Sequence, residues 1–569
     1  MQNNDKKVLL RISNLKQYFP LKGGRFVKAN DGITLDIYEG ETFGLVGESG
    51  CGKSTLGRTI LQLYHQTYGR TMYYGRSLDD LAPKYVIDTV KNLKSRRTKL
   101  RELEQKRDKL EAEYAKLSEK EQYAKHGELD AARKLAEDAL LDITKIVGGF
   151  LVVDDLDPVI AAYSKDYAIA YKLSSMEEKR QELQVDVDDA EYAKKTAEKA
   201  GKSAKDGQLQ RAQEKLKQCD DQIAALRAQL NAGRKEIEAL RAPYANDPEF
   251  QKYEAYRDDG IDLARLEYNE MRRLRRDMQL IFQDPYSSLN PRMSVGQIIS
   301  EGMQAHNMIK KKDARMQEMV LKIMDDCGLA PYFLHRFPHQ FSGGQRQRIG
   351  IARALATKPK FVVCDEAVSA LDVSIQAQII NLLLDLKEQQ NLTYMFITHD
   401  LSVVKYISDR VGVMYLGTMV ELAAADEIFH HPIHPYTEAL LNAIPTTDTV
   451  GAKELSILEG DIPSPVNPPK GCKFHTRCKY CTEICTQVVP EWEEVRPNHF
   501  VACHHKLEVK EFTVTYTDGV ENEEVFADQV YTVKEGDATP AFDGTPAREG
   551  YVFLGWEPEV AETVTGDAT

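Results

Sequence analysis

A glycine-rich segment near the N-terminus constrains the fold of this chain more than any other feature. Residues 47–55 match the pattern G-x-x-x-x-G-K-[ST], a loop whose backbone wraps a phosphate group. An apolar run at 42–46 predicts a strand before the loop, and the pattern at 56–64 predicts a helix after it. This strand–loop–helix context predicts an α/β fold with a mainly parallel sheet.

Each residue of the loop is a candidate for phosphate binding. Backbone N–H groups and the N-terminus of the following helix stabilise the phosphate charge. We expect Lys53 to reach the β- and γ-phosphates and the Ser54 hydroxyl to hold Mg²⁺. We also expect the Cys51 side chain to be partly open when no nucleotide is bound. The candidate residues are Gly47, Glu48, Ser49, Gly50, Cys51, Gly52, Lys53, Ser54 and Thr55.

A second segment supplies the carboxylates that hydrolysis of a nucleotide requires. The apolar run at 361–364 predicts a buried strand that ends at Asp365 and is followed by Glu366. Asp365 can hold Mg²⁺ through water, and Glu366 can polarise an attacking water.

Four further motifs resemble those of ATP-binding cassette (ABC) proteins. Residues 341–348 resemble the ABC signature, 369–372 the D-loop, 398–400 the switch histidine, and Gln283 the Q-loop glutamine. The motifs also occur in the family order. Ser-Gly-Gly-Gln at the start of a helix presents backbone amides, a hydroxyl and a positive dipole end to a phosphate.

The resemblance implies that two cassettes enclose two ATP molecules and that each chain supplies two half-sites. It implies that Gln283 and Asp365 position Mg²⁺ and that His399 senses the γ-phosphate. Phe19 is at the position that contacts adenine, with Tyr18 as its rival, and either can instead be a core residue. Further nucleotide contacts are expected from Ser342, Gly343, Gly344, Gln345 and Asp372.

Three segments narrow the resemblance to importers of oligopeptides and dipeptides, namely 282–291, 372–378 and 434–437. Residues 56–61 resemble the second ATPase subunit of such importers, lettered F. Ala367 departs from the family, which usually has proline there; alanine loosens the turn but removes no catalytic group.

A long insertion separates the two halves of the cassette. Lys53 and Gln283 are 283 − 53 = 230 residues apart, several times the usual family span. Apolar residues recur at alternating steps of three and four between Leu209 and Leu240, and weaker series begin at Leu93 and Leu173. This pattern predicts an antiparallel coiled-coil arm. The alternative is one long surface helix with a solvated face.

Five cysteines cluster near the C-terminus. Cys472, Cys478, Cys485 and Cys503 can hold Zn²⁺ or an iron–sulfur cluster, and their spacing does not decide between the two. The importer family has the same pattern, which implies a [4Fe–4S] cluster with Cys481 as an additional thiol; unliganded thiols are the remaining alternative.

The tail resembles a β-grasp repeat, most closely at 546–556. The predicted domains are two cassette parts, a helical coiled-coil insertion, a Cys-rich region and a β-rich tail. Their ranges are 1–84 and 271–445 for the cassette, 85–270 for the insertion, 446–507 for the Cys-rich region and 508–569 for the tail.

Composition restricts the function further. The net charge of −13 argues against a general nucleic-acid binder, and no apolar run reaches the roughly 18 residues of a membrane span. The family resemblance implies an ATPase that powers peptide import, and the absence of such an apolar run leads us to expect it on the cytoplasmic face of the membrane. Its expected partners are a similar or identical ATPase subunit, a separate permease and, indirectly, an extracytoplasmic peptide-binding protein. The rival hypothesis is a non-transport ABC scaffold that acts through its arm.

Overall fold

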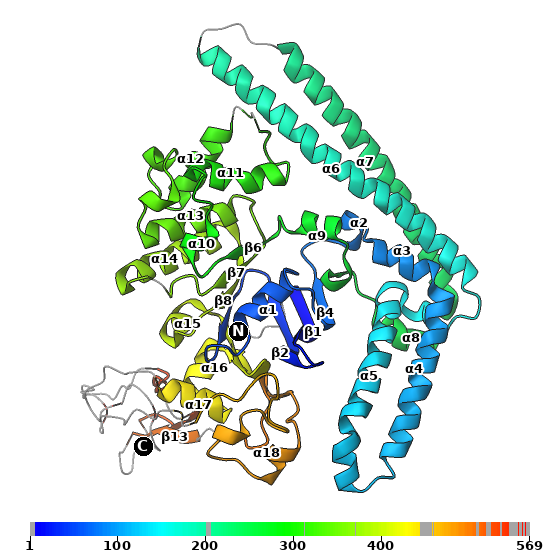
Figure 1. The fold of residues 1–569 in the computed structure, drawn as a ribbon, viewed down its shortest axis with the longest axis vertical. Helices are drawn as coiled ribbons and strands as arrows, with labels where there is room; N and C mark the ends of the chain where they lie inside the picture. The colour runs from blue at the N-terminus through cyan, green and yellow to red at the C-terminus, as the bar shows by residue number, and fades with distance from the viewer. Residues whose placement is uncertain are drawn as a thin grey trace. The chain divides into compact units, whose positions relative to one another are not determined.

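The chain forms two compact units in the computed structural model (Figure 1). The first comprises 1–409, 414–418 and 464–468, and the second comprises 410–413, 419–463 and 469–569. The structure describes residues 6–200, 206–311, 313, 315–369, 371–443, 458, 460–507, 511–518, 525–534, 538–544, 556, 560 and 564.

A parallel sheet forms the centre of the first unit (Figure 1). Strands β3, β8, β7 and β6 lie side by side in this order, and each neighbouring pair is parallel. Helix α1 packs so closely on the sheet that a Cβ on Gly57 would lie 2.8 Å from Val363. The predicted α/β fold is thereby confirmed. The elements are β3 (Thr42–Val46), α1 (Lys53–Ile60), β6 (Met278–Ile281), β7 (Phe361–Asp365) and β8 (Thr393–Ile397).

The first unit also contains an antiparallel sheet of four strands, in the order β2, β1, β4, β5. The short apolar runs 9–12 and 33–37 of the sequence predict two strands, and the observed β1 and β2 are longer than these runs. Register shifts between β1 and β2 allow polar residues to continue the pairing. The strands are β1 (Val8–Pro20), β2 (Phe26–Tyr38), β4 (Tyr68–Tyr73) and β5 (Ile261–Asp262).

Several helices follow one another between β6 and β9, and those after the first share an apolar core, which includes buried Ile299, Met324, Ile349 and Leu383. They are α10 (Pro285–Ser288), α11 (Val295–Ala305), α12 (Met316–Asp326), α13 (Gly343–Leu355), α14 (Val373–Gln390) and α15 (Leu401–Ile407).

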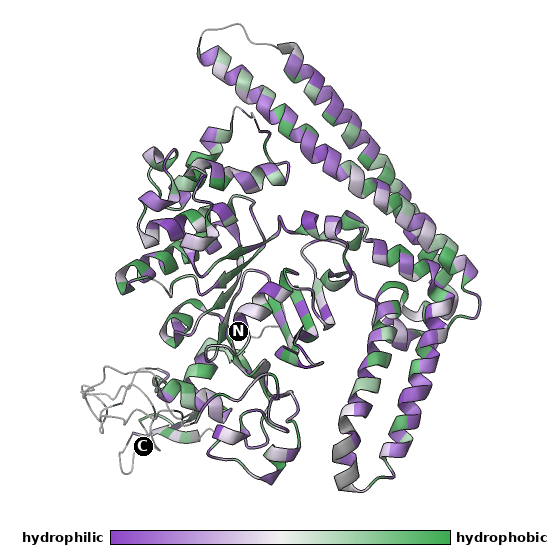
Figure 2. Ribbon diagram, viewed as in Figure 1, coloured by the Kyte–Doolittle hydropathy of each residue, from purple (hydrophilic) through white to green (hydrophobic). Residues whose placement is uncertain are grey.

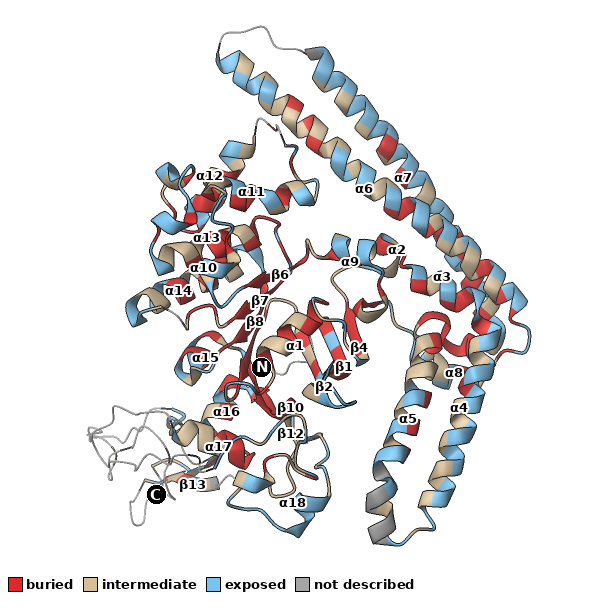
Figure 3. Ribbon diagram, in the orientation of Figure 1, coloured by how far each residue is buried: buried red, intermediate tan, exposed pale blue. Residues whose placement is uncertain are grey.

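Long helices occupy most of the chain between β4 and β5. Helix α4 runs beside α5, and α6 runs beside α7 (Figure 1). Every residue of the apolar series from Leu209 to Leu240 is buried or half-buried, whereas most of the surrounding α7 surface is exposed (Figure 3). Hydrophilic residues make up much of the rest of these helices (Figure 2). The helices are α4 (Leu93–Tyr114), α5 (Glu119–Val147), α6 (Asp157–Lys199) and α7 (Asp206–Arg241).

Shorter elements flank these helices within the range 85–270 and across its two borders. They include β5, which therefore lies inside the range expected to be helical. The others are α3 (Lys84–Lys91), α8 (Pro248–Glu254) and α9 (Tyr268–Leu274).

The long helices also contact the rest of the first unit through ion pairs. Arg70 of β4 pairs with Asp142 of α5 at 2.7 Å and with Asp262 of β5 at 3.3 Å. Arg315 pairs with Asp188 of α6 at 2.8 Å.

The second unit contains strands in the order β11, β12, β10, β9. Glu421 of β10 is fully buried, accepts hydrogen bonds from the Ile433 and His434 amides, and contacts His499 Nε2 at 2.7 Å. The elements are β9 (Arg410–Tyr415, of which 410–413 belong to this unit), β10 (Thr418–Ala424), α16 (Ala425–His430), α17 (Pro435–Asn442), α18 (Glu483–Gln487), β11 (Glu493–Arg496) and β12 (His499–Val501).

The described part of the tail contains an antiparallel pair of strands, β13 (Glu511–Tyr516) and β14 (Gln529–Lys534). Of the predicted tail motif at 546–556, only Trp556 lies among the described residues. None of the helices in the described ranges has the length and apolar character needed to cross a membrane.

Candidate functional site

The loop between β3 and α1 has the backbone conformation that a phosphate cradle requires. Gly47, Gly50 and Gly52 all have positive φ, of 145°, 80° and 103°. A Cβ on Gly52 would lie 2.1 Å from the Ala29 carbonyl oxygen, so only glycine fits there without displacement of the backbone. The Asn30 side chain donates to the Gly52 carbonyl at 3.1 Å and supports the loop.

Lys53 is buried against this loop. Its Nζ donates to the carbonyl oxygens of Gly47 at 2.7 Å and Glu48 at 3.0 Å. It also lies 3.7 Å from Cys51 Sγ. The expectation of a partly open Cys51 is wrong, because this side chain is only 3% exposed and burial raises the pKa of its thiol.

Asp365 ends β7 directly beside the start of α1. Its carboxylate is buried and accepts a hydrogen bond from Ser54 Oγ at 2.5 Å on Oδ1. Arg58 Nη2 donates to Oδ2 at 3.1 Å. Arg58 is absent from the predicted site, because a helix pattern does not reveal which distant carboxylate an arginine contacts.

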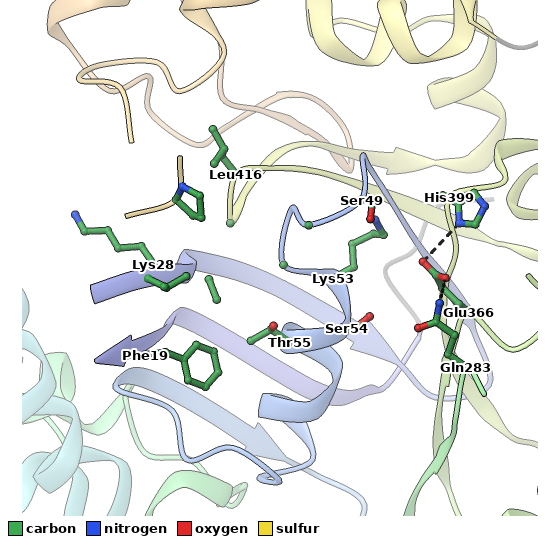
Figure 4. A pocket seen from close by; sticks show the side chains of 16 residues that line it. Phe19, Lys28, Ser49, Lys53, Ser54, Thr55, Gln283, Glu366, His399 and Leu416 are labelled. Atoms are coloured by element: carbon green, nitrogen blue, oxygen red, sulfur yellow. Dashed lines mark hydrogen bonds and ion pairs between the residues drawn. The ribbon is translucent and has the colours of Figure 1, made fainter. Parts of the chain in front are cut away.

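Glu366 lies between the two side chains predicted from the Q-loop and the switch region (Figure 4). Gln283 Nε2 donates to Glu366 Oε2 at 2.5 Å, and His399 Nδ1 lies 3.5 Å from Oε1. The backbone of Glu366 has a φ of 48°, and its amide donates to the Ile397 carbonyl. This unusual conformation turns the carboxylate away from the strand and toward both partners.

These groups line one open pocket of about 670 Å³ (Figure 4). Ser49, Gly50, Gly52, Lys53, Ser54 and Thr55 line it together with Gln283, Glu366 and His399. Phe19 lines the same pocket, whereas the Tyr18 hydroxyl donates to Asp31 Oδ1 at 2.5 Å. The pocket therefore joins the phosphate loop, the carboxylate and an aromatic side chain.

Part of the pocket wall is absent from the sequence-based prediction. The additional lining residues are Val27, Lys28, Ala29, Leu416, Gly417 and Pro465. Pro465 belongs to the proline-rich segment 463–469, whose composition predicts a linker. Its carbonyl accepts a hydrogen bond from the Lys28 amide at 3.2 Å. No motif marks these residues, since they reach the pocket through long-range packing.

The signature residues do not line this pocket. Ser342 is the N-cap of α13 and exchanges hydrogen bonds with Gln345 in a capping box. Gly343 and Gly344 form the first turn of this helix. Asp372 caps α14 by accepting a hydrogen bond from the Ile375 amide at 3.0 Å, while the adjacent D-loop residue Ala370 lies outside the described residues.

The four candidate metal ligands in the second unit lie near one another. The Cys472 amide donates to the Cys485 carbonyl at 2.8 Å. Burial raises the pKa of Cys503 to about 12, with smaller contributions from neighbouring Cys472, Cys478 and Cys485. Burial likewise raises the pKa of Cys472 to about 11. Among the side chains that the structure describes, no three His, Cys, Asp or Glu residues form a ready metal site.

Comparisons with known proteins agree with this geometry. The family model described as "ABC transporter" matches residues 30–251 and 251–369. The model described as "Oligopeptide/dipeptide transporter, C-terminal region" matches residues 420–485.

Three curated relatives are similar to this chain. The oligopeptide transport ATP-binding protein AppF of Bacillus subtilis is 52% identical over 250 residues, covering 43% of this chain and 75% of AppF. A putative peptide import ATP-binding protein of Brucella ovis is 54% identical over 245 residues, covering 43% of this chain and 77% of the relative. The putative oligopeptide transport ATP-binding protein YkfD of Bacillus subtilis is 34% identical over 498 residues, covering 87% of this chain and 95% of YkfD.

The fold and the site thus define an ABC-type ATPase. More particularly, the chain belongs to the ABC transporter family as an ATP-binding subunit of the oligopeptide/dipeptide importer family.

Proposed function

We propose that this chain hydrolyses ATP to power the import of peptides through a separate membrane permease. The observation that carries the proposal is the placement of Glu366 between Gln283 and His399, in the pocket that the phosphate loop also lines. A carboxylate held by two polar side chains is suited to orient and polarise a water molecule. The names of the similar proteins support peptides as the transported substrate.

Within the site, each side chain has a separate role. The loop 47–55 binds the phosphates, Lys53 neutralises their charge, and Phe19 packs against adenine. Glu366 accepts the proton of the attacking water, and His399 contacts the γ-phosphate. Signature residues Ser342–Gln345 and Asp372 contact the ATP of a second ATPase subunit, which agrees with their position outside the pocket of their own chain.

The donor set beside the phosphate loop fits Mg²⁺. Ser54 Oγ and the buried Asp365 carboxylate are adjacent hard oxygen donors, which magnesium prefers. Gln283 is the third residue assigned to this ion. Ser54 and Asp365 would hold the ion, which would neutralise part of the phosphate charge when bound.

The finer features of the family resemblance belong to the same proposal. We assign the chain to the F-type subunit, on the cytoplasmic face of the membrane, acting with an extracytoplasmic peptide-binding protein. The domain ranges are 1–84 and 271–445 for the cassette, 85–270 for a coiled-coil insertion, 446–507 for the Cys-rich region and 508–569 for a β-grasp-like tail.

Glu366→Gln tests the ATPase mechanism. Turnover should fall by about 10²–10⁴-fold, because the amide cannot accept the proton, whereas ATP affinity should persist through the phosphate loop. Glu267→Gln is the matched control, since Glu267 is exposed and pairs with Lys84 away from the pocket.

Co-purification with co-expressed permease tests the transport assignment. Wild-type turnover in Glu366→Gln, or failure to associate with any importer permease, would contradict the proposal.

A [4Fe–4S] cluster on Cys472, Cys478, Cys485 and Cys503 is also proposed, with Zn²⁺ as the alternative. Their mutual proximity and thiol chemistry support a four-cysteine ligand set, although these ligands must draw together to hold it. Anaerobically purified protein should contain about four irons per chain, as such a cluster requires. Cys503→Ser should lose the metal, whereas Cys481→Ser should retain it. One zinc per chain would favour the tetrahedral site.

A further inference from the structure

An arginine contacts the buried carboxylate that the proposed function assigns to Mg²⁺. Ser54 and Arg58 lie one turn apart on α1, so both side chains project toward the end of β7. Ser54 donates to Asp365 Oδ1 at 2.5 Å and Arg58 donates to Oδ2 at 3.1 Å. The two carboxylate oxygens therefore have different partners from the same helix.

The two separate partners of the Asp365 oxygens matter because this carboxylate is buried. The Asp365 side chain is 1% exposed, so its charge requires partners that replace water. The guanidinium supplies a positive charge to Oδ2 and leaves Oδ1 directed at the Ser54 hydroxyl. A carboxylate held in this way keeps one oxygen aligned with the second oxygen donor of the proposed metal site.

Arg58 is itself held in place. Burial opposes its charge, but the nearby Tyr64 hydroxyl and the charge of Asp365 prevail and raise the pKa of Arg58. The Tyr64 ring packs edge-on against Phe19, with ring centroids 5.3 Å apart and planes at 88°. Physical contacts thus extend from the aromatic wall of the pocket through Tyr64 and Arg58 to Asp365.

We propose that Arg58 is a positioning residue that holds Asp365 in the geometry required to receive Mg²⁺. This inference rests on the proposed function, which assigns Ser54 and Asp365 to the metal. Arg58 is not among the residues that line the nucleotide pocket, whereas it contacts Asp365 directly, so its effect acts through Asp365. A purely structural ion pair would instead affect folding and nucleotide binding irrespective of the metal.

The test compares ATP binding in EDTA with ATP binding during a Mg²⁺ titration, in the full chain. Arg58→Met should raise the half-saturating Mg²⁺ concentration about tenfold, while ATP affinity in EDTA changes less than twofold. Arg58→Lys should give an intermediate value, because lysine keeps the charge without the planar fork. Arg11→Met is the control, since Arg11 pairs with Asp36 on β1 and β2, away from the pocket.

Two outcomes would overturn the inference. One is an Arg58→Met protein with unchanged or lower half-saturating Mg²⁺; the other is an equal loss of ATP affinity with and without the metal. Wild-type protein whose ATP binding and hydrolysis ignore Mg²⁺ would instead reject the metal assignment in the proposed function. Glu366→Gln turnover separates the two cases, because it tests the water-activating group independently of Arg58.

Discussion

Two glycines of the phosphate loop differ in what surrounds them, although both have positive φ. A Cβ on Gly52 would lie 2.1 Å from the Ala29 carbonyl oxygen, whereas a Cβ on Gly50 would meet nothing within 4 Å. Gly50→Ala should therefore suffer only the strain of a left-handed residue, about 1–2 kcal/mol. Gly52→Ala must in addition displace β2 or the loop, so it should lose ATP affinity more than tenfold.

Equilibrium ATP binding, together with urea denaturation, checks this difference. The comparison is informative because both variants add one methyl group to the same loop. Equal ATP affinity in Gly50→Ala and Gly52→Ala would show that the loop tolerates movement at Ala29.

At the same scale, sequence motifs predict only part of the site. Lys53, Asp365 and Glu366 follow from local patterns, because strand ends and glycine loops have characteristic residue spacing. Arg58 and Pro465 do not, because their roles depend on contacts with residues about 300 or more positions away. Cys51 shows a related limit: its position in the loop is evident, but its burial depends on how the loop closes over Lys53.

Helix α17 contains an unusual N-cap. His434 Nδ1 accepts the Tyr436 amide at 3.0 Å, and its own amide donates to buried Glu421. Burial lowers the pKa of His434 to about 4, with the charge of Glu421 opposing this shift. The folded protein therefore keeps this imidazole neutral at a pH where an unfolded chain, with a pKa near 6.5, binds a proton.

Because the folded-state pKa is the lower one, this histidine reduces stability as pH falls from about 6.5 toward 4. The loss should approach about 1.4 kcal/mol per pH unit across that window. His434→Asn should flatten the dependence, since asparagine caps a helix without titrating. Both tryptophans, Trp492 and Trp556, belong to the second unit, so their fluorescence during urea denaturation reports on this unit.

Exposed His430→Asn is the matched control and should retain the wild-type pH dependence. If the His434→Asn protein loses stability as steeply as wild type between pH 6.5 and 4, another titratable group of this unit causes the pH dependence. Buried His431 and His499, with Glu421 and Glu427, are the other titratable groups near this position.

Strand positions were predicted well where the sequence has a continuous apolar run, and poorly where the strands pair irregularly. The parallel strands are continuous apolar runs, so β3 and β7 agree closely with their predicted positions at 42–46 and 361–364. The strand β1 extends eight residues beyond the predicted run to Pro20, because its bulged pairing with β2 includes polar residues. The two-residue strand β5 has no detectable pattern and is defined by its partner β4.

On the scale of the whole molecule, we ask whether the first unit folds without the inserted helices. A deletion that tests this must retain β5. Ile261 and Asp262 pair with Tyr73 and Met72 of β4, and Ile261 is fully buried. Asp262 also contacts buried Arg70 at 3.3 Å, and its amide donates to Tyr85 at 3.1 Å. A deletion across 88–268 would therefore remove part of a sheet as well as the long helices.

We expect a deletion of 94–259, bridged by a Gly/Ser linker, to give a soluble protein that binds ATP with near-wild-type affinity. It retains β5, α9 and the Asp262 contacts, whereas the long helices bury much of their apolar surface against one another. The deletion of 88–268 removes Asp262 as well, and loss of this buried partner should destabilise the first unit by about 3–5 kcal/mol relative to the shorter deletion. Thermal unfolding with and without ATP measures the stability of both proteins.

Two outcomes would contradict this expectation. Insolubility of the 94–259 deletion would show that the long helices stabilise the cassette through contacts such as Arg315 with Asp188. Equal stability of the two deletions would show that β5 contributes little to the sheet.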